Sequence, residues 1–311
     1  LQKIENIICE ELVAEGCQEV SLTALQQKET WEQTNRWDDA VVDNWFKTEL
    51  KNGTALGLAF THEEPITALM AGYVSSYKDL PFAAFQFQTK FRNEARAKSG
   101  IMRGREFIMK DLYSFSLDKQ QHDAYYENMK KVYMRIFDRI GIGEQTYLTM
   151  SSGGTFSKYS FEFQTITSAG EDIILYDPNT KIAINKDDYS EELLKDFGLL
   201  DKGIEFLEAA SSEVGDIYSL GTRYSEALGL CYTDHNGNQQ PVYMGSYGIG
   251  VPRVMGTVVE THCDEKGMVW PASIAPFALH LVSLVKESGK SAVDDVYVAL
   301  TSQGIDVLYD D

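Results

Sequence analysis

The chain has 311 residues, and its 47 acidic side chains against 28 basic ones give it a formal net charge of −19. Hydrophobic residues at 43% and aromatic residues at 12% are typical of a globular protein and exclude a disordered one. The acidity argues against bulk attraction to nucleic acid or to an anionic membrane, although a local basic patch can still bind a polyanion.

The N-terminal region begins with an amphipathic helix pattern. Apolar residues recur at helical spacing up to Leu12, and Gly16 is a plausible stop. Residues 18–25, QEVSLTAL, predict a strand, and residues 31–38, WEQTNRWD, predict a loop rich in large side chains. No apolar run is long enough to span a membrane, and the start does not resemble a signal peptide. We therefore expect a soluble, cytoplasmic protein.

A second helix is predicted from Thr61. Thr61 and Glu64 have capping-box spacing, and an apolar stripe continues to Tyr77. Thr61 and Glu63 can be read as a helix cap and a first-turn acid, or as hydroxyl and carboxylate acceptors for an ammonium group. His62 is interpreted as a packing or surface residue rather than a ligand.

Residues 82–116 predict an antiparallel hairpin that carries a basic run. The segment FAAFQFQTKFRNE alternates apolar and polar residues, AKSG breaks the pattern, and REFIMKDLYSF returns as a second strand. Residues 90–111 hold seven of the 28 basic side chains, and the strand pattern arranges them in rows on a sheet. The second strand places five residues on one face, namely Arg105, Phe107, Met109, Asp111 and Tyr113.

The rest of the chain predicts mixed elements. A long helix covers about 118–140 and ends at Gly141, short strands and a helical piece near 189–198 fill 145–241, and a strand, glycine turn and helix follow. The segment IAPF at 274–277 suggests a boundary, after which a β-α-β pattern begins. We thus expect a domain over 1–277 and an incomplete second one over 278–311.

The hairpin suggests phosphate chemistry. Arginine binds phosphate and carboxylate oxygens through a fork of donors, so Arg92, Arg103 and Arg105 could hold a triphosphate. Phe107 offers a surface for a nucleobase, and Glu94 an acceptor for an exocyclic amine. The alternative is a solvated hairpin whose arginines pair with nearby acids.

The segment GSYGIGVPR, which ends at Arg253, gives a weaker signal. It is neither a Walker A loop nor a dinucleotide fingerprint, and strand–helix packing would also explain its glycines. The chain lacks HExxH-type histidine spacing, a GxSxG serine and a reactive-cysteine setting. The absence of these motifs favours chemistry done by positioning and charge neutralisation, as in nucleotidyl transfer.

The hairpin closely resembles motif 2 of class II aminoacyl-tRNA synthetases, in the form found in bacterial-type prolyl-tRNA synthetases. The resemblance rests on FRNE and RGREFIMKDLYSF, and it extends to KIENIICEELVAEGCQEV, WEQTNRWD, THEE, GTFSKYSFEFQTI, EVGDIYSLGTRYSEALG and MGSYGIGVPR. It implies an α+β fold, with an antiparallel sheet flanked by helices and followed by the start of an α/β anticodon-binding domain in GMVWPASIAPF and GIDVLYDD.

The resemblance also implies roles for particular residues. Catalysis would fall to Arg92 and Arg253. ATP would be bound by Arg92, Glu94, Arg103, Arg105, Phe107, Glu213, Asp216, Ser246, Gly248, Gly250 and Arg253, with Glu213 also at Mg²⁺. Proline would be bound by Thr61, Glu63, Arg92, Met109, Asp111, Tyr113 and Tyr218, and the tRNA acceptor end by Arg96 and Lys98.

The implied function is a proline–tRNA ligase. It would use ATP and Mg²⁺ to make prolyl-adenylate and transfer the prolyl group to tRNA(Pro), and it would act as a homodimer. Two alternatives stay open: a catalytically inactive synthetase paralogue that binds amino acid or tRNA, and a sister synthetase for threonine or serine. Zinc-site residues expected for threonine are not apparent, and the Thr61 and Glu63 loop favours proline.

The sequence departs from the family pattern at three positions. Thr23 stands where motif 1 has a proline, Phe161 where the family has a histidine, and Asp216 where a histidine usually follows Glu-Val-Gly. The segment 145–241 is too short for the bacterial insertion that hydrolyses mischarged alanyl-tRNA, so we expect no such editing. The resemblance also implies that the family's segment before motif 1 is missing and that the anticodon domain is cut after its first third.

Overall fold

The centre of the structure is a large, mostly antiparallel sheet. The computed structural model describes residues 1–95, 100–154, 157–285 and 290–310. Within these residues the main sheet has nine strands in the order β1, β5, β6, β14, β11, β8, β7, β10, β9. Neighbouring strands are antiparallel except β1 with β5 and β10 with β7. The strands are β1 (Gln18–Glu19), β5 (Phe82–Phe91), β6 (Glu106–Ser116), β7 (Thr146–Ser152), β8 (Tyr159–Ile166), β9 (Asp172–Tyr176), β10 (Ala183–Asn185), β11 (Leu207–Gly221) and β14 (Tyr243–Gly250).

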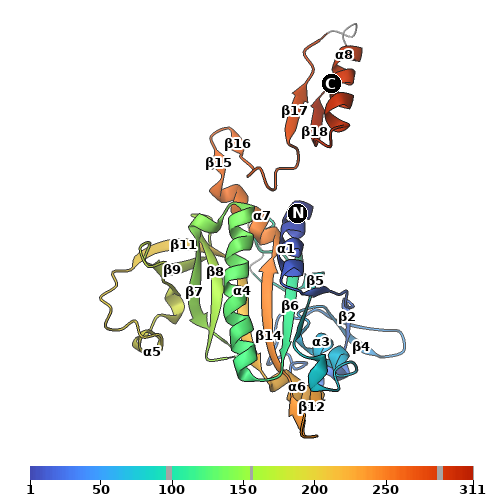
Figure 1. Cartoon of the computed structure of the whole chain (residues 1–311), viewed down its shortest axis with the longest axis vertical. Coiled ribbons are helices and arrows are strands. Elements are labelled where there is room, and N and C mark those ends of the chain that lie inside the picture. Colours follow the sequence, from blue (N-terminus) through green and yellow to red (C-terminus); the bar gives the residue numbers. More distant parts are fainter. Residues whose placement is uncertain (96–99, 155–156, 286–289, 311) are drawn as a thin grey trace.

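Three helices cover one face of this sheet, α1 (Gln2–Ala14), α4 (Lys119–Ile140) and α7 (Val251–Thr261), and Figure 1 shows α4 lying along the strands. The buried stripe of α4, which includes Met129, Tyr133 and Phe137, packs into the main core with Phe163 of β8. Gly141 ends α4 with φ +103°, a left-handed conformation that glycine adopts at little cost. The predicted extent of this helix is confirmed.

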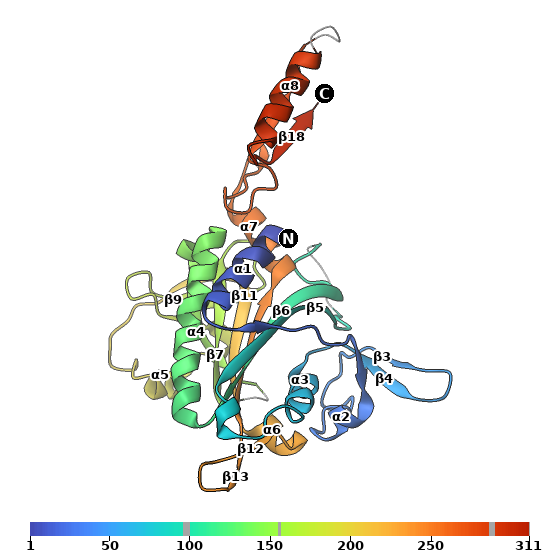
Figure 2. The same ribbon diagram turned by 45° about the vertical axis from the view of Figure 1, so that its right-hand side comes forward.

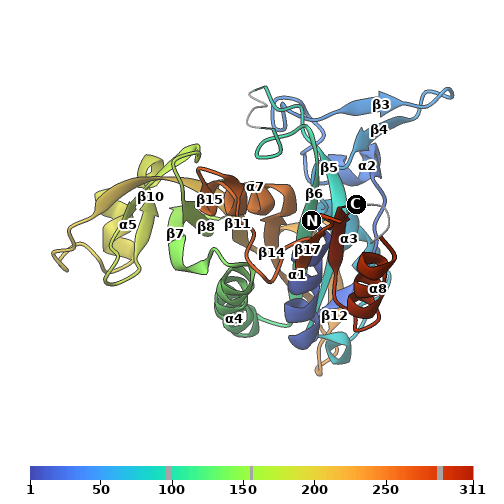
Figure 3. The same ribbon diagram turned by 90° about the horizontal axis from the view of Figure 1, so that it is seen from above.

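Smaller elements surround the sheet. A three-stranded sheet of β2 (Leu25–Gln27), β4 (Ala55–Leu58) and β3 (Lys47–Glu49) extends to one side, as the view from above shows (Figure 3). The remaining elements are α2 (Lys28–Glu32), α3 (Glu63–Met70), α5 (Glu191–Asp196), α6 (Arg223–Leu228), β12 (Cys231–Thr233), β13 (Gln239–Pro241), β15 (Cys263–Asp264) and β16 (Gly267–Met268), with 3-10 turns at Tyr77–Asp79, Gly143–Gln145 and Lys186–Asp188.

The C-terminal unit projects from the end of the sheet domain (Figure 2). It consists of β17 (Leu279–Val282), α8 (Lys290–Thr301) and β18 (Val307–Asp310), and β17 pairs in parallel with β18. The predicted β-α-β pattern is therefore present. Among the described residues, no helix combines the length and apolar character that crossing a membrane requires.

The predicted hairpin is formed by β5 and β6, but two of its basic residues do not face solvent. Lys90 and Lys110 are both fully buried. Lys110 donates to the Tyr133 hydroxyl and to the Tyr247 carbonyl at 3.0 Å, and burial lowers its pKa to about 7. The prediction that these two lysines belong to a row of basic charge on the sheet was therefore wrong, because residues from distant segments bury them.

The helix predicted from Thr61 is shorter than its sequence pattern. It begins at Glu63, His62 precedes it without a side-chain cap, and it ends at Met70. Tyr73 is 74% exposed and lies beyond it. The capping-box interpretation was wrong, because the Thr61 hydroxyl donates to the Glu63 carboxylate and the Glu64 carboxylate binds Arg36.

Candidate functional site

The strand register gathers the candidate residues on the sheet face opposite α4. Asp111 of β6 pairs with Gly248 of β14, which pairs with Asp216 of β11. Alternate residues of a strand point to opposite faces, so Leu112 and Ile217 enter the core under α4 while their neighbours point the other way. Two adjoining pockets open on this second face, and both are lined by Arg92, Met109, Asp216 and Gly248.

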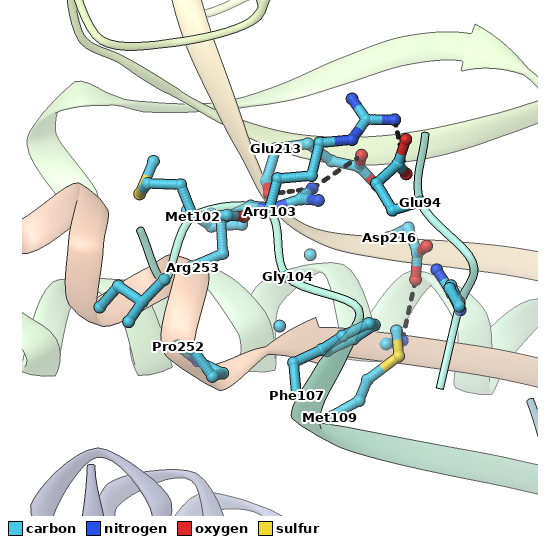
Figure 4. A pocket seen from close by; sticks show the side chains of 16 residues that line it. Glu94, Met102, Arg103, Gly104, Phe107, Met109, Glu213, Asp216, Pro252 and Arg253 are labelled. Atoms are coloured by element: carbon cyan, nitrogen blue, oxygen red, sulfur yellow. Dashed lines mark hydrogen bonds and ion pairs between the residues drawn. The ribbon is translucent and has the colours of Figure 1, made fainter. Parts of the chain in front are cut away.

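The first pocket, called the arginine pocket below, lies between the hairpin, β11 and the start of α7. Its volume is about 670 Å³, continuous with solvent. Figure 4 shows Arg103, Glu94 and Glu213 at one side and Phe107 and Met109 at the other. The pocket is lined by Arg92, Glu94, Ile101, Met102, Arg103, Gly104, Phe107, Met109, Glu213, Val214, Gly215, Asp216, Gly248, Gly250, Pro252 and Arg253. Nine of the residues proposed for ATP therefore meet in one cavity.

Carboxylates and carbonyls orient the arginines of this pocket. Arg253, in the first turn of α7, donates to the Met102 carbonyl at 3.1 Å and to the Glu213 carbonyl at 3.0 Å, and its guanidinium lies 3.3 Å from the Glu213 carboxylate. Arg103 bridges Glu94 at 2.9 Å and Glu171 at 2.6 Å. The Arg103 side chain is 30% exposed and the Arg253 side chain is 33% exposed, so incoming anions can reach both guanidinium groups.

Arg92 stands where the two pockets meet. Its guanidinium carbon lies 5.0 Å from the centre of the Phe60 ring and 5.5 Å from that of Phe107, and its Nε donates to the Phe60 carbonyl at 3.4 Å. The two rings give the arginine a defined direction through cation–π contact. Arg92 and Arg253, the two residues expected to be catalytic, share the arginine pocket.

The second pocket, called the Glu63 pocket below, contains every residue proposed for proline. It is lined by Arg36, Val41, Val42, Asp43, Asn44, Phe60, Thr61, Glu63, Arg92, Met109, Asp111, Tyr113, Asp216, Tyr218, Arg223, Ser246 and Gly248, with a volume of about 1060 Å³ that includes its open mouth. Glu63 is the hub. Its carboxylate accepts from the hydroxyls of Thr61 at 2.6 Å, Ser246 at 3.2 Å and Tyr113 at 3.4 Å.

A buried ionic network supports the floor of the Glu63 pocket. Lys90 Nζ lies 2.8 Å from Asp111 Oδ1, and Gln86 donates to Asp111 Oδ2 at 2.9 Å. His62 joins the network: burial, with the charge of Lys90, lowers its pKa to about 4. The neutral ring accepts from Lys90 through Nδ1, and its Nε2 donates to the Thr23 carbonyl at 3.1 Å. His62 is therefore a buried positioning residue, and the departure at Thr23 contributes only its backbone.

An acidic group forms the wall between β8 and β11. The register pairs Asp216 with Glu162 of the neighbouring strand. Burial, together with Glu162 and other carboxylates, raises the pKa of Glu213 to about 8 and that of Asp216 to about 6. Among the described residues no group of three or more histidine, cysteine, aspartate or glutamate side chains could by itself hold a metal ion.

Some of the residues expected to bind a substrate do not line the pocket assigned to that substrate. Arg105 is exposed and lines neither pocket, and Ser246 lines the Glu63 pocket rather than the arginine pocket. Arg96 and Lys98 lie outside the described residues. Phe161 points away from the site and packs beneath α4, with Lys130 Nζ 3.6 Å from its ring centre. This departure from the family pattern therefore leaves the lining of the pockets unchanged.

Sequence reasoning missed Arg36, Glu64, Lys90 and Glu171 as parts of the site. Arg36 contacts Glu63 and Glu64, and Glu171 holds Arg103. The single signal available was the arginine inside WEQTNRWD, a segment already noted for its large side chains. Glu171, on the turn between β8 and β9, carried no signal, because its partner is 68 positions away.

The chain is similar in sequence to a known family and to known proteins. Residues 46–262 match the family described as the tRNA synthetase class II core domain (G, H, P, S and T). The proline–tRNA ligase of Rickettsia bellii is 33% identical over 323 residues, which cover 100% of this chain and 74% of that protein. The proline–tRNA ligase of Parvibaculum lavamentivorans is 36% identical over 335 residues and is covered to 76%.

Solved structures agree on the fold. A Giardia lamblia prolyl-tRNA synthetase in complex with prolyl-adenylate matches with a TM-score of 0.76 at 18% identity, covering 100% of this chain and 58% of that one. A Cryptosporidium parvum prolyl-tRNA synthetase complexed with L-proline and AMP matches with a TM-score of 0.73 at 14% identity, covering 100% and 56%. The predicted α+β class II fold is thereby confirmed.

Proposed function

Because the chain belongs to the class II prolyl-tRNA synthetases, we propose that it is a proline–tRNA ligase, which activates L-proline with ATP and transfers the prolyl group to tRNA(Pro). The observation that carries this proposal is the position of Arg92, which lines both pockets. An amino acid in the Glu63 pocket and a nucleotide in the arginine pocket would present their reacting carboxylate and α-phosphate to the same guanidinium. Bringing two reactants together in this way is a large part of catalysis.

The arginine pocket would bind ATP. Arg103 and Arg253 would exchange their carboxylate partners for oxygens of the triphosphate, with Arg105 reaching in from the exposed loop. Phe107 would stack on the adenine and Glu94 would accept from its amino group. Asp216, Gly248 and Gly250 would border the nucleotide, and Ser246, which lies deeper, would act through Glu63.

The Glu63 pocket would bind proline. The Glu63 carboxylate and the Thr61 hydroxyl would accept from the secondary ammonium, and Arg92 would bind the carboxylate. Met109, Tyr113 and Tyr218 would enclose the ring, and Asp111 would supply the polar floor.

Magnesium would accompany the nucleotide, and the residues present fit it. Mg²⁺ takes oxygen ligands and is usually held by one or two carboxylates plus substrate phosphates. Glu213 lies beside Glu162 and Asp216, and burial together with these acids raises the pKa of its carboxyl although Arg253 opposes the rise, so an added cation would offset excess negative charge here. Glu213 would hold the ion. When bound, Mg²⁺ would neutralise charge on the phosphates and on the departing pyrophosphate.

The reaction would proceed in two steps without a protein nucleophile. A proline carboxylate oxygen attacks the α-phosphorus, a new P–O bond forms, and the bond to the β-phosphate oxygen breaks with loss of pyrophosphate. A ribose hydroxyl at the tRNA 3′ end then attacks the adenylate carbonyl, AMP leaves, and the hydroxyl proton is released. Arg92 stabilises the charge that develops in the first step. Arg96 and Lys98 would contact the acceptor end of the tRNA.

Assembly and domain organisation are further parts of the proposal. Residues 1–277 would form the catalytic domain and 278–311 part of an anticodon-binding domain, and 145–241 would carry no editing of alanyl-tRNA. A homodimer would form along the edge strand β1, where Leu69, Met70 and Tyr73 line an apolar hollow with Phe82. The protein would act in the cytoplasm.

Exchange of pyrophosphate into ATP tests the proposal. We expect exchange that depends on proline and on Mg²⁺. Binding of proline without exchange would support the inactive paralogue instead, and exchange driven by threonine or serine would support a sister synthetase. Rapid hydrolysis of alanyl-tRNA by the chain would contradict the expected lack of editing.

A further inference from the structure

A buried arginine lies behind the Glu63 carboxylate. Arg36 is 6% exposed, and its NH1 nitrogen lies 3.4 Å from Glu63 Oε2, 3.0 Å from Glu64 Oε1 and 3.2 Å from Glu64 Oε2. The same nitrogen donates to the Tyr224 hydroxyl at 2.8 Å. The loop after α2, the start of α3 and α6 thus meet at one guanidinium.

We propose that Arg36 is a positioning residue for the amino-acid substrate: it fixes the Glu63 carboxylate and, shared between Glu63 and Glu64, leaves this cluster with a single net negative charge that matches one ammonium group. The proposal rests on the proposed function, because it assigns Glu63 to the ammonium of proline.

The surroundings leave Arg36 little freedom. Its guanidinium carbon lies 5.0 Å from the ring centre of Trp31 and 5.8 Å from that of Tyr224, and both rings are buried. Arginine suits such a place because its planar fork can stack on a ring and serve several acceptors at once. A lysine has neither property. The position of Glu63 is therefore defined from behind by Arg36 and from the pocket side by Thr61, Ser246 and Tyr113.

The charge of the cluster follows from its members. Glu63 and Glu64 each carry one negative charge when ionised, and Arg36 offsets one of them. Glu64 is completely buried and also accepts from the Thr34 hydroxyl at 2.8 Å. Burial raises the pKa of Glu64 to about 7, and the positive charge of Arg36 opposes that rise. Without Arg36 the two acids would retain a proton, and Glu63 would be a poorer ammonium acceptor.

The neighbouring charges occur in equal numbers of each sign, since Asp43 and Arg223 also line the pocket and carry opposite charges. Lys90 and Asp111 form their own ion pair with a neutral His62. Asp216 and Arg92 lie at the border with the arginine pocket, where the substrate carboxylate and the nucleotide would bind. The ammonium end of the substrate therefore meets the Arg36, Glu63 and Glu64 cluster.

The test compares four variants in proline-dependent pyrophosphate exchange and in calorimetric binding of L-proline. For Arg36→Met we expect the KM for proline to rise about 30-fold, the effect of losing a charge-assisted contact, with the KM for ATP within about twofold of wild type. Adding Glu64→Gln to Arg36→Met leaves Glu63 as the one carboxylate of the cluster, so that its negative charge is no longer shared with a protonated neighbour, and we expect the double variant to recover most of the lost proline affinity. Arg36→Lys should recover less than this double variant does.

Arg135→Met is the matched control. Arg135 also bridges two carboxylates, at 3.1 Å from Glu11 and 2.7 Å from Glu15, but it lies on the outer surface of α4, so we expect both KM values to stay unchanged. A purely structural role would raise the two KM values together and would give no recovery from Glu64→Gln, and either result overturns the inference.

Failure of the two proposals can be told apart. If wild type exchanges pyrophosphate but Arg36→Met leaves proline affinity unchanged, the inference alone is wrong. If wild type neither exchanges nor binds proline, both are wrong. If Arg36→Met does not fold, the double variant gives the answer, since proline binding near the wild-type level supports the inference and loss of binding in a folded double variant contradicts it.

Discussion

The arginine pocket and the Glu63 pocket share Arg92, Met109, Asp216 and Gly248, but their charges are held in different ways. In the arginine pocket, Arg103 and Arg253 keep about a third of their side-chain surface exposed and pair with acids at the rim. In the Glu63 pocket, Arg36, Glu64 and Lys90 are all buried. Exposed pairs are weak and exchangeable, whereas breaking a buried pair leaves an uncompensated charge.

This difference fits the ligands we assign. A nucleotide brings several negative charges and must replace existing partners of the arginines, which half-exposed pairs allow at small cost. Proline is small and brings a single ammonium, so its recognition depends on a preformed arrangement of fixed charge. Substitutions in the Glu63 pocket should therefore affect stability and specificity, whereas those in the arginine pocket should mainly affect nucleotide affinity.

The largest effect is expected for Lys90→Met. Removal of this buried ammonium leaves the Asp111 carboxylate uncompensated, and we expect the free energy of unfolding to fall by about 3–5 kcal/mol. Urea denaturation measures it. Lys158→Met is the control, because Lys158 forms exposed pairs with Glu192 and Asp196, and the loss of exposed pairs should cost far less stability than the loss of a buried one. Equal losses in the two variants would show that burial of the Lys90 and Asp111 pair adds nothing to its contribution to stability.

Arg92→Met should have the largest effect on activity. Because Arg92 serves both pockets and faces the reacting groups, we expect kcat/KM for pyrophosphate exchange to fall by about 10²–10³-fold with respect to both substrates. Arg253→Met is the comparison, since Arg253 lines the arginine pocket but not the Glu63 pocket. It should raise the KM for ATP and leave that for proline near wild type. A rise in the proline KM of Arg253→Met would contradict this division of roles.

Glu171→Gln should have a modest effect in the opposite direction. Glu171 lies 2.6 Å from Arg103 and competes with phosphate for it, so we expect the KM for ATP to fall by up to about fivefold, with unfolding free energy unchanged within about 1 kcal/mol. Steady-state exchange at varied ATP measures the first quantity. Glu192→Gln is the control, because Glu192 is an exposed acid of α5 that pairs with Lys158, and it should change neither quantity. An increased KM for ATP would mean that Glu171 helps to hold the arginine for the nucleotide.

The smallest effect is a pH dependence at Asp216. Its pKa is raised to about 6 in the folded protein, so the folded state binds the proton more tightly than the unfolded state. The protonated Asp216 carboxyl therefore stabilises the folded state at low pH, and this stabilisation is lost as the pH rises through about 6. We expect Asp216→Asn to raise Tm by roughly 2–4 °C at pH 7.5 and by less at pH 4.5, measured without nucleotide or Mg²⁺. An equal shift at both pH values would show that ionisation of the Asp216 carboxyl is not the cause.

Local patterns predicted most of the elements that carry the site. The alternation in FAAFQFQTKF and REFIMKDLYSF gives the hairpin and places Phe107, Met109, Asp111 and Tyr113 on one face, and in the structure these four residues line the two adjoining pockets. The helix pattern of 118–140 is equally direct, since its apolar stripe and Gly141 are local signals. The helix at Thr61 was misjudged, because Glu64 was read as a cap although its partner is Arg36.

The charged residues separate what the sequence determined from what the tertiary structure decided. Periodicity by itself determined a hairpin that carries arginines, because backbone pattern is a local property. The resemblance of the motif 2 segment to class II synthetases implied the α+β synthetase fold. The sequence did not reveal that Lys90 and Lys110 are buried or that Arg36 lies behind Glu63. These placements depend on partners far along the chain, such as Tyr224, which is 188 positions from Arg36. Whether a charge is solvated, paired or buried is fixed only when the fold brings those partners together.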